Sequence, residues 1–216
     1  MDRTRHKGII YFSDNRPEPH ILNMVHVELA KTNLPIVSVT LKPMNFGKNI
    51  VLPLERGWGT YFKQILTALE NIDTDIVFFC EHDVLYPQSH FEFTPPTKDK
   101  FYYNNNWVKI DWPYTKAVSW QADQVSGLVC DRLLALDWYT KKVAQFDSEK
   151  FDRRFEPGSG TEQAEKWMSA EPYVDIRQDK VATKNKWSLA DFRDKTSAKN
   201  FKTCECPEWA RELVNG

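Results

Sequence analysis

The chain has 216 residues and nearly balanced charge, with 29 basic and 30 acidic side chains. A chain of this length can bury a substantial core, and one domain is the natural expectation. The balanced charge produces no overall field that would attract nucleic acid or an anionic membrane, so any phosphate binding must be local. No apolar run approaches the roughly 20 residues that span a bilayer, and we expect a soluble, cytoplasmic protein.

The first part of the chain alternates predicted strands and helices. Strands are expected over residues 8–13, 35–41 and 76–80, a helix follows Pro19, and a second helix spans 58–72. The second helix is the clearest element, because its apolar side chains recur along one face. This order of strand, helix, strand, helix and strand is typical of a right-handed parallel α/β unit.

The second half of the chain has a different character. Residues 87–113 are rich in aromatic and amide side chains, which predicts a long irregular connection that is functional rather than disordered. A strand over 117–120, a helix over 131–146, a short helix from Thr161 and a strand over 173–177 are expected to follow.

The segment beyond Lys180 is polar and charged. It predicts an irregular tail that packs on the domain through Trp187, Phe192 and Trp209. Within this segment, Cys204 and Cys206 form a C-x-C pair, and with no second pair nearby the spacing does not favour zinc.

The most informative segment is the end of the third predicted strand, where an apolar run stops at Glu81 and Asp83. Ligand sites in parallel sheets lie beyond the carboxyl ends of the strands. Carboxylate oxygens suit Mg²⁺ or Mn²⁺, and an ion that also bridges phosphate oxygens needs only one or two of them from the protein. An acidic turn that ends at Pro87 is an equally good interpretation of these residues alone. His82, between the two acids, would point away from them if the strand alternation continued, which favours a packed histidine over a ligand.

Several familiar catalytic and nucleotide-binding motifs are absent. The sequence contains no G-x-G-x-x-G, no Walker lysine loop, no G-x-S-x-G and no H-E-x-x-H. Dinucleotide-binding, P-loop, serine-hydrolase and zincin functions therefore have no support in the sequence.

The order of the remaining motifs resembles that of the GT-A glycosyltransferases of the family-two-like type, including the small capsid-glycosylating domains of large algal viruses. The matching features are a polar, glycine-bearing loop over 55–59, the amphipathic helix, the apolar strand, and Glu81-His82-Asp83 followed by Val84-Leu85-Tyr86-Pro87. Residues 125–132 resemble the acceptor-side segment of the family. The resemblance covers about residues 8–170, with Glu81 in place of the usual first aspartate.

The resemblance implies a single GT-A-like, Rossmann-like α/β domain with a mainly parallel sheet flanked by helices. This domain would span residues 1–190, with a nucleotide-sugar-binding half over 8–87 and an acceptor half over 88–190. A C-terminal tail over 191–216 would pack on it.

The implied function is a metal-dependent glycosyltransferase of the hexosyltransferase type, which moves a sugar from a UDP-sugar to a carbohydrate or glycoprotein acceptor. Mn²⁺ or Mg²⁺ would bind Asp83 directly. Glu81 would bind the ion through water or contact the donor, and Asp175 or Asp179 would complete the metal shell.

The resemblance also implies positions for donor contacts. Asp14 would accept a hydrogen bond from the uracil imide, with Asn15 beside it, and Arg56 or Lys63 would lie near the phosphates. His82 is a further candidate for donor contact. An ordinary polar turn remains an alternative for Asp14 and Asn15.

An inverting transfer needs a carboxylate that deprotonates the acceptor hydroxyl. Phe151-Asp152 and Glu162 resemble the region where inverting members keep this group, and Glu162 is the first candidate, with Asp123 and Glu156 behind it. Each of these acids has the alternative role of a surface or capping charge.

Two other functions stay open at the level of sequence. The same carboxylates would serve a metal-dependent phosphohydrolase of nucleotide-sugars, in which water is the nucleophile. The aromatic stretch over 101–112 would suit a non-catalytic carbohydrate-binding domain in which the acids are structural.

Overall fold

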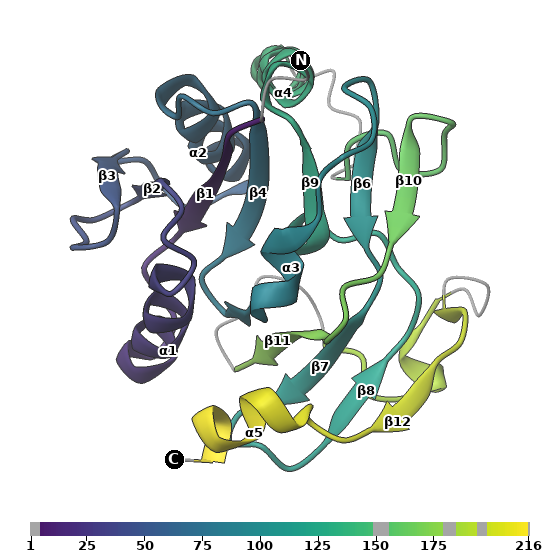
Figure 1. Ribbon diagram of the computed structural model, residues 1–216. Coiled ribbons are helices and arrows are strands. Elements are labelled where there is room, and N and C mark those ends of the chain that lie inside the picture. Colours follow the sequence, from purple (N-terminus) through teal and green to yellow (C-terminus); the bar gives the residue numbers. More distant parts are fainter. Residues whose placement is uncertain (1–4, 149–155, 179–184, 194–197, 216) are drawn as a thin grey trace.

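The computed structural model describes residues 5–148, 156–178, 185–193 and 198–215. Figure 1 shows a large sheet with helices packed against it and a second, smaller sheet beside it. The expected α/β class, with a mainly parallel sheet flanked by helices, is confirmed.

The larger sheet has seven strands in the order β10-β6-β9-β4-β1-β2-β3. They are β1 (Lys7–Ser13), β2 (Ile36–Thr40), β3 (Lys48–Val51), β4 (Ile76–Glu81), β6 (Phe101–Asn104), β9 (Leu128–Asp131) and β10 (Ala164–Trp167). β1 pairs in parallel with β2 and β4, and β3 and β10 also run parallel to their neighbours. β9 is antiparallel to both strands beside it.

Coverage of both faces explains why β4 is apolar from Ile76 to Cys80. Phe79 belongs to the buried cluster shared with α2 (Trp58–Asn71) and α4 (Arg132–Asp147). Phe78 belongs to the cluster on the other face, which includes the buried side of α1 (Pro19–Ala30). Both phenylalanines are fully buried, as expected for a strand between two helical layers.

The smaller sheet has five strands in the order β12-β8-β7-β11-β5. They are β5 (Val84–Leu85), β7 (Trp107–Asp111), β8 (Ala117–Ser119), β11 (Tyr173–Arg177) and β12 (Lys202–Cys204). Two short helices complete the fold, α3 (Gln88–Glu92) and α5 (Glu208–Asn215). None of the helices in the described ranges has the length and apolarity needed to cross a bilayer.

The two sheets are joined by the turn that carries the predicted acidic motif. β4 of the larger sheet ends at Glu81, and His82 and Asp83 lead into β5 of the smaller sheet. β5 pairs antiparallel with β11, which sets Asp175 opposite Val84. The acidic turn therefore lies where the two sheets meet, next to a strand that comes much later in the chain.

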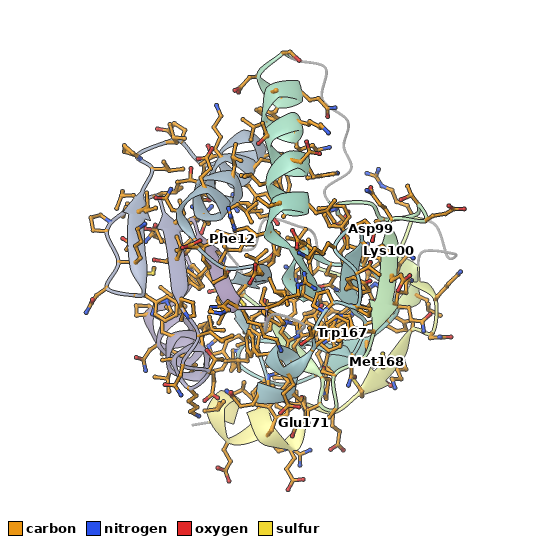
Figure 2. The ribbon with its side chains drawn as sticks, turned by 45° about the horizontal axis from the view of Figure 1, so that its top comes forward. Phe12, Asp99, Lys100, Trp167, Met168 and Glu171 are labelled. Atoms are coloured by element: carbon orange, nitrogen blue, oxygen red, sulfur yellow. The ribbon has the colours of Figure 1, made fainter. Side chains whose placement is uncertain are left out.

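The edge strand β10 is held by aromatic and charged side chains. Trp167 stacks on Phe93 with ring centres 4.2 Å apart, and Lys100 pairs with Glu165 across the β6–β10 pair. Trp167 and Lys100 are labelled in Figure 2, together with Met168, which is exposed just after the strand. These contacts fix the segment that follows the turn containing Glu162.

Three expectations for the second half are wrong. Residues 87–113 are not an irregular connection, because they form α3, β6 and β7. Thr161 begins no helix but lies in a turn that leads into β10. The C-terminal segment is not irregular, since it contains β12 and α5, although Trp187, Phe192 and Trp209 do pack on the core as expected. Strands of three to five residues are too short to give a reliable hydrophobic period.

Candidate functional site

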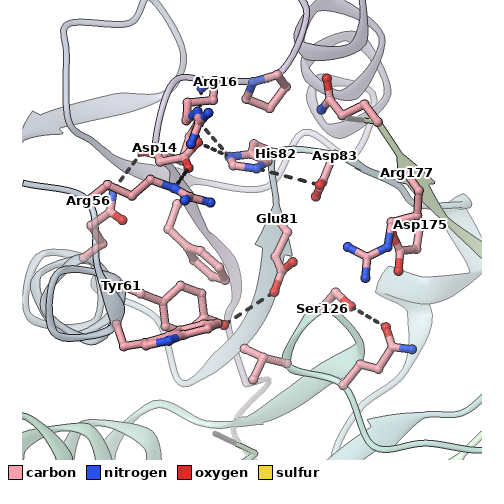
Figure 3. Close-up of a pocket in the computed structure, with 18 of the residues that line it drawn as sticks. Asp14, Arg16, Arg56, Tyr61, Glu81, His82, Asp83, Ser126, Asp175 and Arg177 are labelled. Atoms are coloured by element: carbon pink, nitrogen blue, oxygen red, sulfur yellow. Dashed lines mark hydrogen bonds and ion pairs between the residues drawn. The ribbon is translucent and has the colours of Figure 1, made fainter. Parts of the chain in front are cut away.

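A cavity of about 580 Å³ opens at the carboxyl ends of β1 and β4, at the junction of the two sheets. Its lining comes from the turns after these strands, the start of α2, strands β7 and β11, and the loop before β9. Figure 3 shows Glu81 and Asp83 in the middle of this cavity, with Asp14 and Arg56 on one side and Asp175 and Arg177 on the other.

Three of the carboxylates that line this cavity, Glu81, Asp83 and Asp175, act on one another electrostatically. Asp83 and Asp175 are buried, and Glu81 is half-buried. Burial, and then the charges of Asp83 and Asp175, raise the pKa of Glu81 to about 8. Burial also raises the pKa of Asp83, and the charge of Asp175 adds to this effect. Neighbouring carboxylates repel one another when all are ionised, and a cation bound between them would relieve this repulsion.

Two basic side chains pair with Asp175, each with a different carboxylate oxygen. The Lys109 ammonium lies 3.5 Å from Oδ2, and the Arg177 Nε lies 3.5 Å from Oδ1. Burial lowers the pKa of Lys109 to about 8, opposed by the charge of Asp175. Sequence reasoning missed Lys109 and Arg177. The signal for Lys109 was a lone lysine inside an apolar strand, where an uncompensated charge is costly.

The structure brings Asp14, Arg56 and His82 to the cavity. The Arg56 Nε lies 2.6 Å from Asp14 Oδ2, and the Arg16 amide donates to Asp14 Oδ1 at 3.1 Å. His82 does not point away from the acids as expected, because it stands in a turn where strand alternation has ended. Its ring lies 3.8 Å from Asp14 Oδ1 and 3.8 Å from Asp83 Oδ2, and Nδ1 hydrogen bonds with the Ser13 hydroxyl at 2.9 Å.

Asn15 and Lys63 do not line the cavity. The Asn15 side-chain oxygen instead accepts hydrogen bonds from the amides of Leu41 and Lys42, both at 2.9 Å. Lys63 pairs with Asp147 of α4 at 2.9 Å. Successive residues of a helix are rotated by about 100° around its axis. Other residues of α2, including Tyr61 and Gln64, therefore face the cavity in place of Lys63.

The candidate bases are separated by the fold. Asp123 and Glu156 line the cavity, and the Ser159 hydroxyl donates to Asp123 Oδ2 at 2.7 Å. The Lys166 ammonium lies 3.6 Å from Asp123 Oδ1. Glu162 is exposed in the turn before β10 and does not line the cavity.

Some predicted residues, namely Phe151, Asp152 and Asp179, lie outside the described residues.

The carboxylates fit a metal ion that shares its coordination with a ligand. Within the described ranges, no three His, Cys, Asp or Glu side chains are placed to hold an ion by themselves. Cys204 and Cys206 therefore belong to no such group. An ion that bridges phosphate oxygens needs only one or two protein carboxylates. Asp83 and Asp175, side by side and rich in oxygen donors, satisfy that smaller requirement.

Neither a protein-family model nor a curated protein matches the chain. Among solved structures, a glycosyltransferase involved in glycosylation of the major capsid of PBCV-1 is 10% identical, with 79% of this chain and 92% of that chain covered and a TM-score of 0.46. A mutant of Drosophila beta-1,4-galactosyltransferase 7, in complex with manganese, UDP-Gal and xylobiose, is 11% identical, with 88% and 81% covered and a TM-score of 0.45.

A third similar structure is the inositol-1-phosphate CTP transferase from T. maritima, which is 12% identical, with 98% of this chain and 95% of that chain covered and a TM-score of 0.43. TM-scores below 0.5 at such identities indicate a remote likeness and do not determine the chemistry. The sheet order and strand directions agree with the GT-A-like class expected from the sequence. The activity must be argued from the site itself.

Proposed function

We propose that this chain is a metal-dependent glycosyltransferase that moves a sugar from a UDP-sugar to a carbohydrate or glycoprotein acceptor. The observation that supports this most directly is the position of Asp83 beside Asp175 in a cavity that also holds Glu81. Such a cavity, at the carboxyl ends of parallel strands, is the usual place for a nucleotide in an α/β sheet.

Asp83 and Asp175 are the proposed ligands of Mn²⁺ or Mg²⁺, with Glu81 contacting the ion through water or the donor sugar. A divalent ion supplies positive charge for the diphosphate leaving group when the glycosidic bond breaks. Arg177 lies against the same carboxylates and adds a fixed positive charge.

The nucleoside is proposed to bind on the side of Asp14 and Arg56. Asp14 has lone pairs beyond those used by Arg56 and the Arg16 amide, and one of them would accept the uracil imide proton. Arg56 pairs with Asp14 through Nε, and its side chain is 40% exposed, so its other guanidinium nitrogens would be accessible to the phosphates of an entering nucleotide.

Asp123 is the proposed general base, because it lines the cavity and is held by Ser159 and Lys166. It would take the proton of the acceptor hydroxyl as that oxygen attacks the anomeric carbon and the bond to the diphosphate breaks. The product would have inverted anomeric configuration. Glu162 would need to reach the cavity from an exposed turn, which makes it the weaker candidate.

Calorimetric titration of UDP in the presence of Mn²⁺, repeated with excess chelator and with GDP, tests this proposal. We expect UDP binding that chelation weakens at least about tenfold, and the same loss in Asp83→Asn. Asp137→Asn is the matched control, because Asp137 is exposed on α4. UDP binding that is indifferent to both chelator and Asp83→Asn would contradict the metal assignment.

Turnover separates the remaining functions. A glycosyltransferase should consume a UDP-sugar faster when an acceptor alcohol is added, and the sugar should appear on that alcohol. Cleavage that no acceptor accelerates would indicate a phosphohydrolase, and glycan binding unaffected by chelation and by Asp83→Asn would indicate a carbohydrate-binding domain.

A further inference from the structure

Lys109 is a buried cation that points into the cavity from β7. It is 4% exposed and still lines the cavity. The parallel pairing of β7 with β11 sets it beside Asp175, and its ammonium lies 4.6 Å from the centre of the Trp120 ring. Burying an ammonium is costly even when it is paired. A lysine kept here, beside an aromatic ring at a cavity wall, suits contact with a ligand.

A second lysine adds positive charge to the cavity wall formed by Lys109, Trp120 and Asp175, which we call the lysine wall or simply this wall. Lys186 lines the same cavity, and its charge acts on Lys109. Its ammonium lies 4.6 Å from the centre of the Phe192 ring, and no acidic side chain of the described ranges forms an ion pair with it. Asp175 thus pairs with two cations, Lys109 and Arg177. Lys186 is a third cation in the lining of the same cavity.

Two of the cations at this wall share one carboxylate, because Lys109 and Arg177 both pair with Asp175. The charge of Arg177 also acts on Glu81 and Asp83, whereas Lys186 has no carboxylate partner among the described residues. A divalent ion held by Asp83 and Asp175 would draw on the same carboxylate and add positive charge beside the two lysines. An anionic group of a ligand would offset that charge.

The position of this wall distinguishes it from the proposed nucleoside side. In Figure 3, Asp175 and Arg177 lie across the cavity from Asp14 and Arg56. The chain continues from Trp120 to Asp123, the proposed base, and both line the cavity. Trp120 is 6% exposed and packs against the Lys109 ammonium, so it holds that cation at the wall. Fixed cations on the same side as the proposed base suit a negative charge on the acceptor.

We propose that Lys109 and Lys186, beside Trp120, form a subsite for an anionic oxygen group, and that this group is a carboxylate on the acceptor carbohydrate. This inference rests on the proposed glycosyltransferase function and deepens it by naming an acidic acceptor. The other source of the same chemistry is the distal phosphate of the donor nucleotide.

Ligand-observed NMR tests the subsite directly by comparing two sugars that differ in charge. Dissociation constants are measured for methyl glucuronide, methyl glucoside and, with Mn²⁺, UDP. We expect the wild type to prefer the glucuronide by about tenfold, the size of one hydrogen bond to a charged group. Lys109→Met and Lys186→Gln should each abolish the preference. Lys186→Gln should also leave UDP affinity within about twofold, because among the described residues Lys186 forms no ion pair with Asp175. Lys31→Gln, a surface change at the end of α1, should alter neither.

The outcomes separate this subsite from the proposed function. A wild type without the preference, or variants that retain it, would overturn the subsite. Variants that lose UDP affinity but keep the sugar preference would assign the wall to the donor phosphate and overturn the acidic acceptor. Sugar preference without any UDP binding would support the subsite and count against the nucleotide-sugar donor. Lys186→Gln keeps the test valid if Lys109→Met fails to fold, because Lys186 is only half-buried.

Discussion

The backbone amide of Ile176 donates a 2.8 Å hydrogen bond to the carbonyl oxygen of Asp83. Because this bond fixes β11 on the turn after β4, the neighbouring Asp175 is brought to the cavity occupied by Glu81 and Asp83 (Figure 3). Backbone pairing, rather than a side-chain contact, thus joins the acidic motif to a residue far along the chain.

Removing one partner of the ion pair between Asp175 and Lys109 should lower the free energy of unfolding, because the other charge would stay buried without a partner. We expect Asp175→Asn to lower the free energy of unfolding by about 3 kcal/mol, because Lys109 would stay buried without its carboxylate. The double variant Lys109→Met with Asp175→Asn should recover at least about 1 kcal/mol of that loss. Urea unfolding of all four proteins measures the coupling, and strictly additive effects would show that the two residues do not interact.

Asp123 and Glu162 should respond differently to removal of their charge. Asp123→Asn should lower the transfer rate by about 10²- to 10⁴-fold, the usual effect of losing a general base, with little change in UDP affinity. Glu162→Gln should leave the rate within about twofold, because Glu162 is exposed outside the cavity. Steady-state rates with a saturating donor compare the two, and the reverse ranking would return the role of base to Glu162.

Gly57, which lines the cavity, and Gly127, which follows the cavity residue Ser126, should differ in their tolerance of a methyl group. A Cβ at Gly127 would lie 2.8 Å from the backbone oxygen of Asn104 and 2.8 Å from the Tyr173 hydroxyl, whereas a Cβ at Gly57 would meet nothing within 4 Å. Gly127→Ala should therefore lower the free energy of unfolding by about 1–3 kcal/mol. Gly57→Ala should change it by less than about 0.5 kcal/mol. Equal effects in urea unfolding would contradict the close approach at Gly127.

His90 should make the fold sensitive to acid. It is fully buried, its Nδ1 accepts a hydrogen bond from the Asn104 amide, and burial lowers its pKa from 6.5 to about 3. Below about pH 6.5 the unfolded chain takes up a proton that the folded chain refuses, so stability is present above that pH and falls as pH decreases towards about 3. The loss should reach about 1.4 kcal/mol per pH unit.

Urea unfolding between about pH 7 and pH 5 measures this slope. His90→Gln should reduce it, because glutamine does not titrate. His6→Gln is the control, since His6 is exposed, and it should leave the slope unchanged. A wild-type slope that His90→Gln does not reduce would show that other groups cause the acid sensitivity.

Local patterns in the sequence were sufficient for most of the first half of the molecule, although they did not predict β3, which lies in the segment 42–55 that was expected to be a loop. The apolar run of β4, the helical period of α2 and the acids at the strand end each depend on neighbours a few residues away. The same is true of Glu81 and Asp83 as cavity residues, because a strand end fixes their place. The second half lacked such patterns, since its strands are short and its aromatic and amide residues have no clear period.

By itself, the sequence determined the parallel α/β class and the carboxylates at the end of β4 and in the turn after it. Only the tertiary structure decided which other charges meet them. Lys109, Asp175 and Arg177 reach the cavity through the pairing of β5, β7 and β11, while Lys63 and Glu162 do not line it. The physical reason is that strand pairing between distant segments depends on the packing of the whole core, whereas periodicity and strand ends are properties of a few consecutive residues.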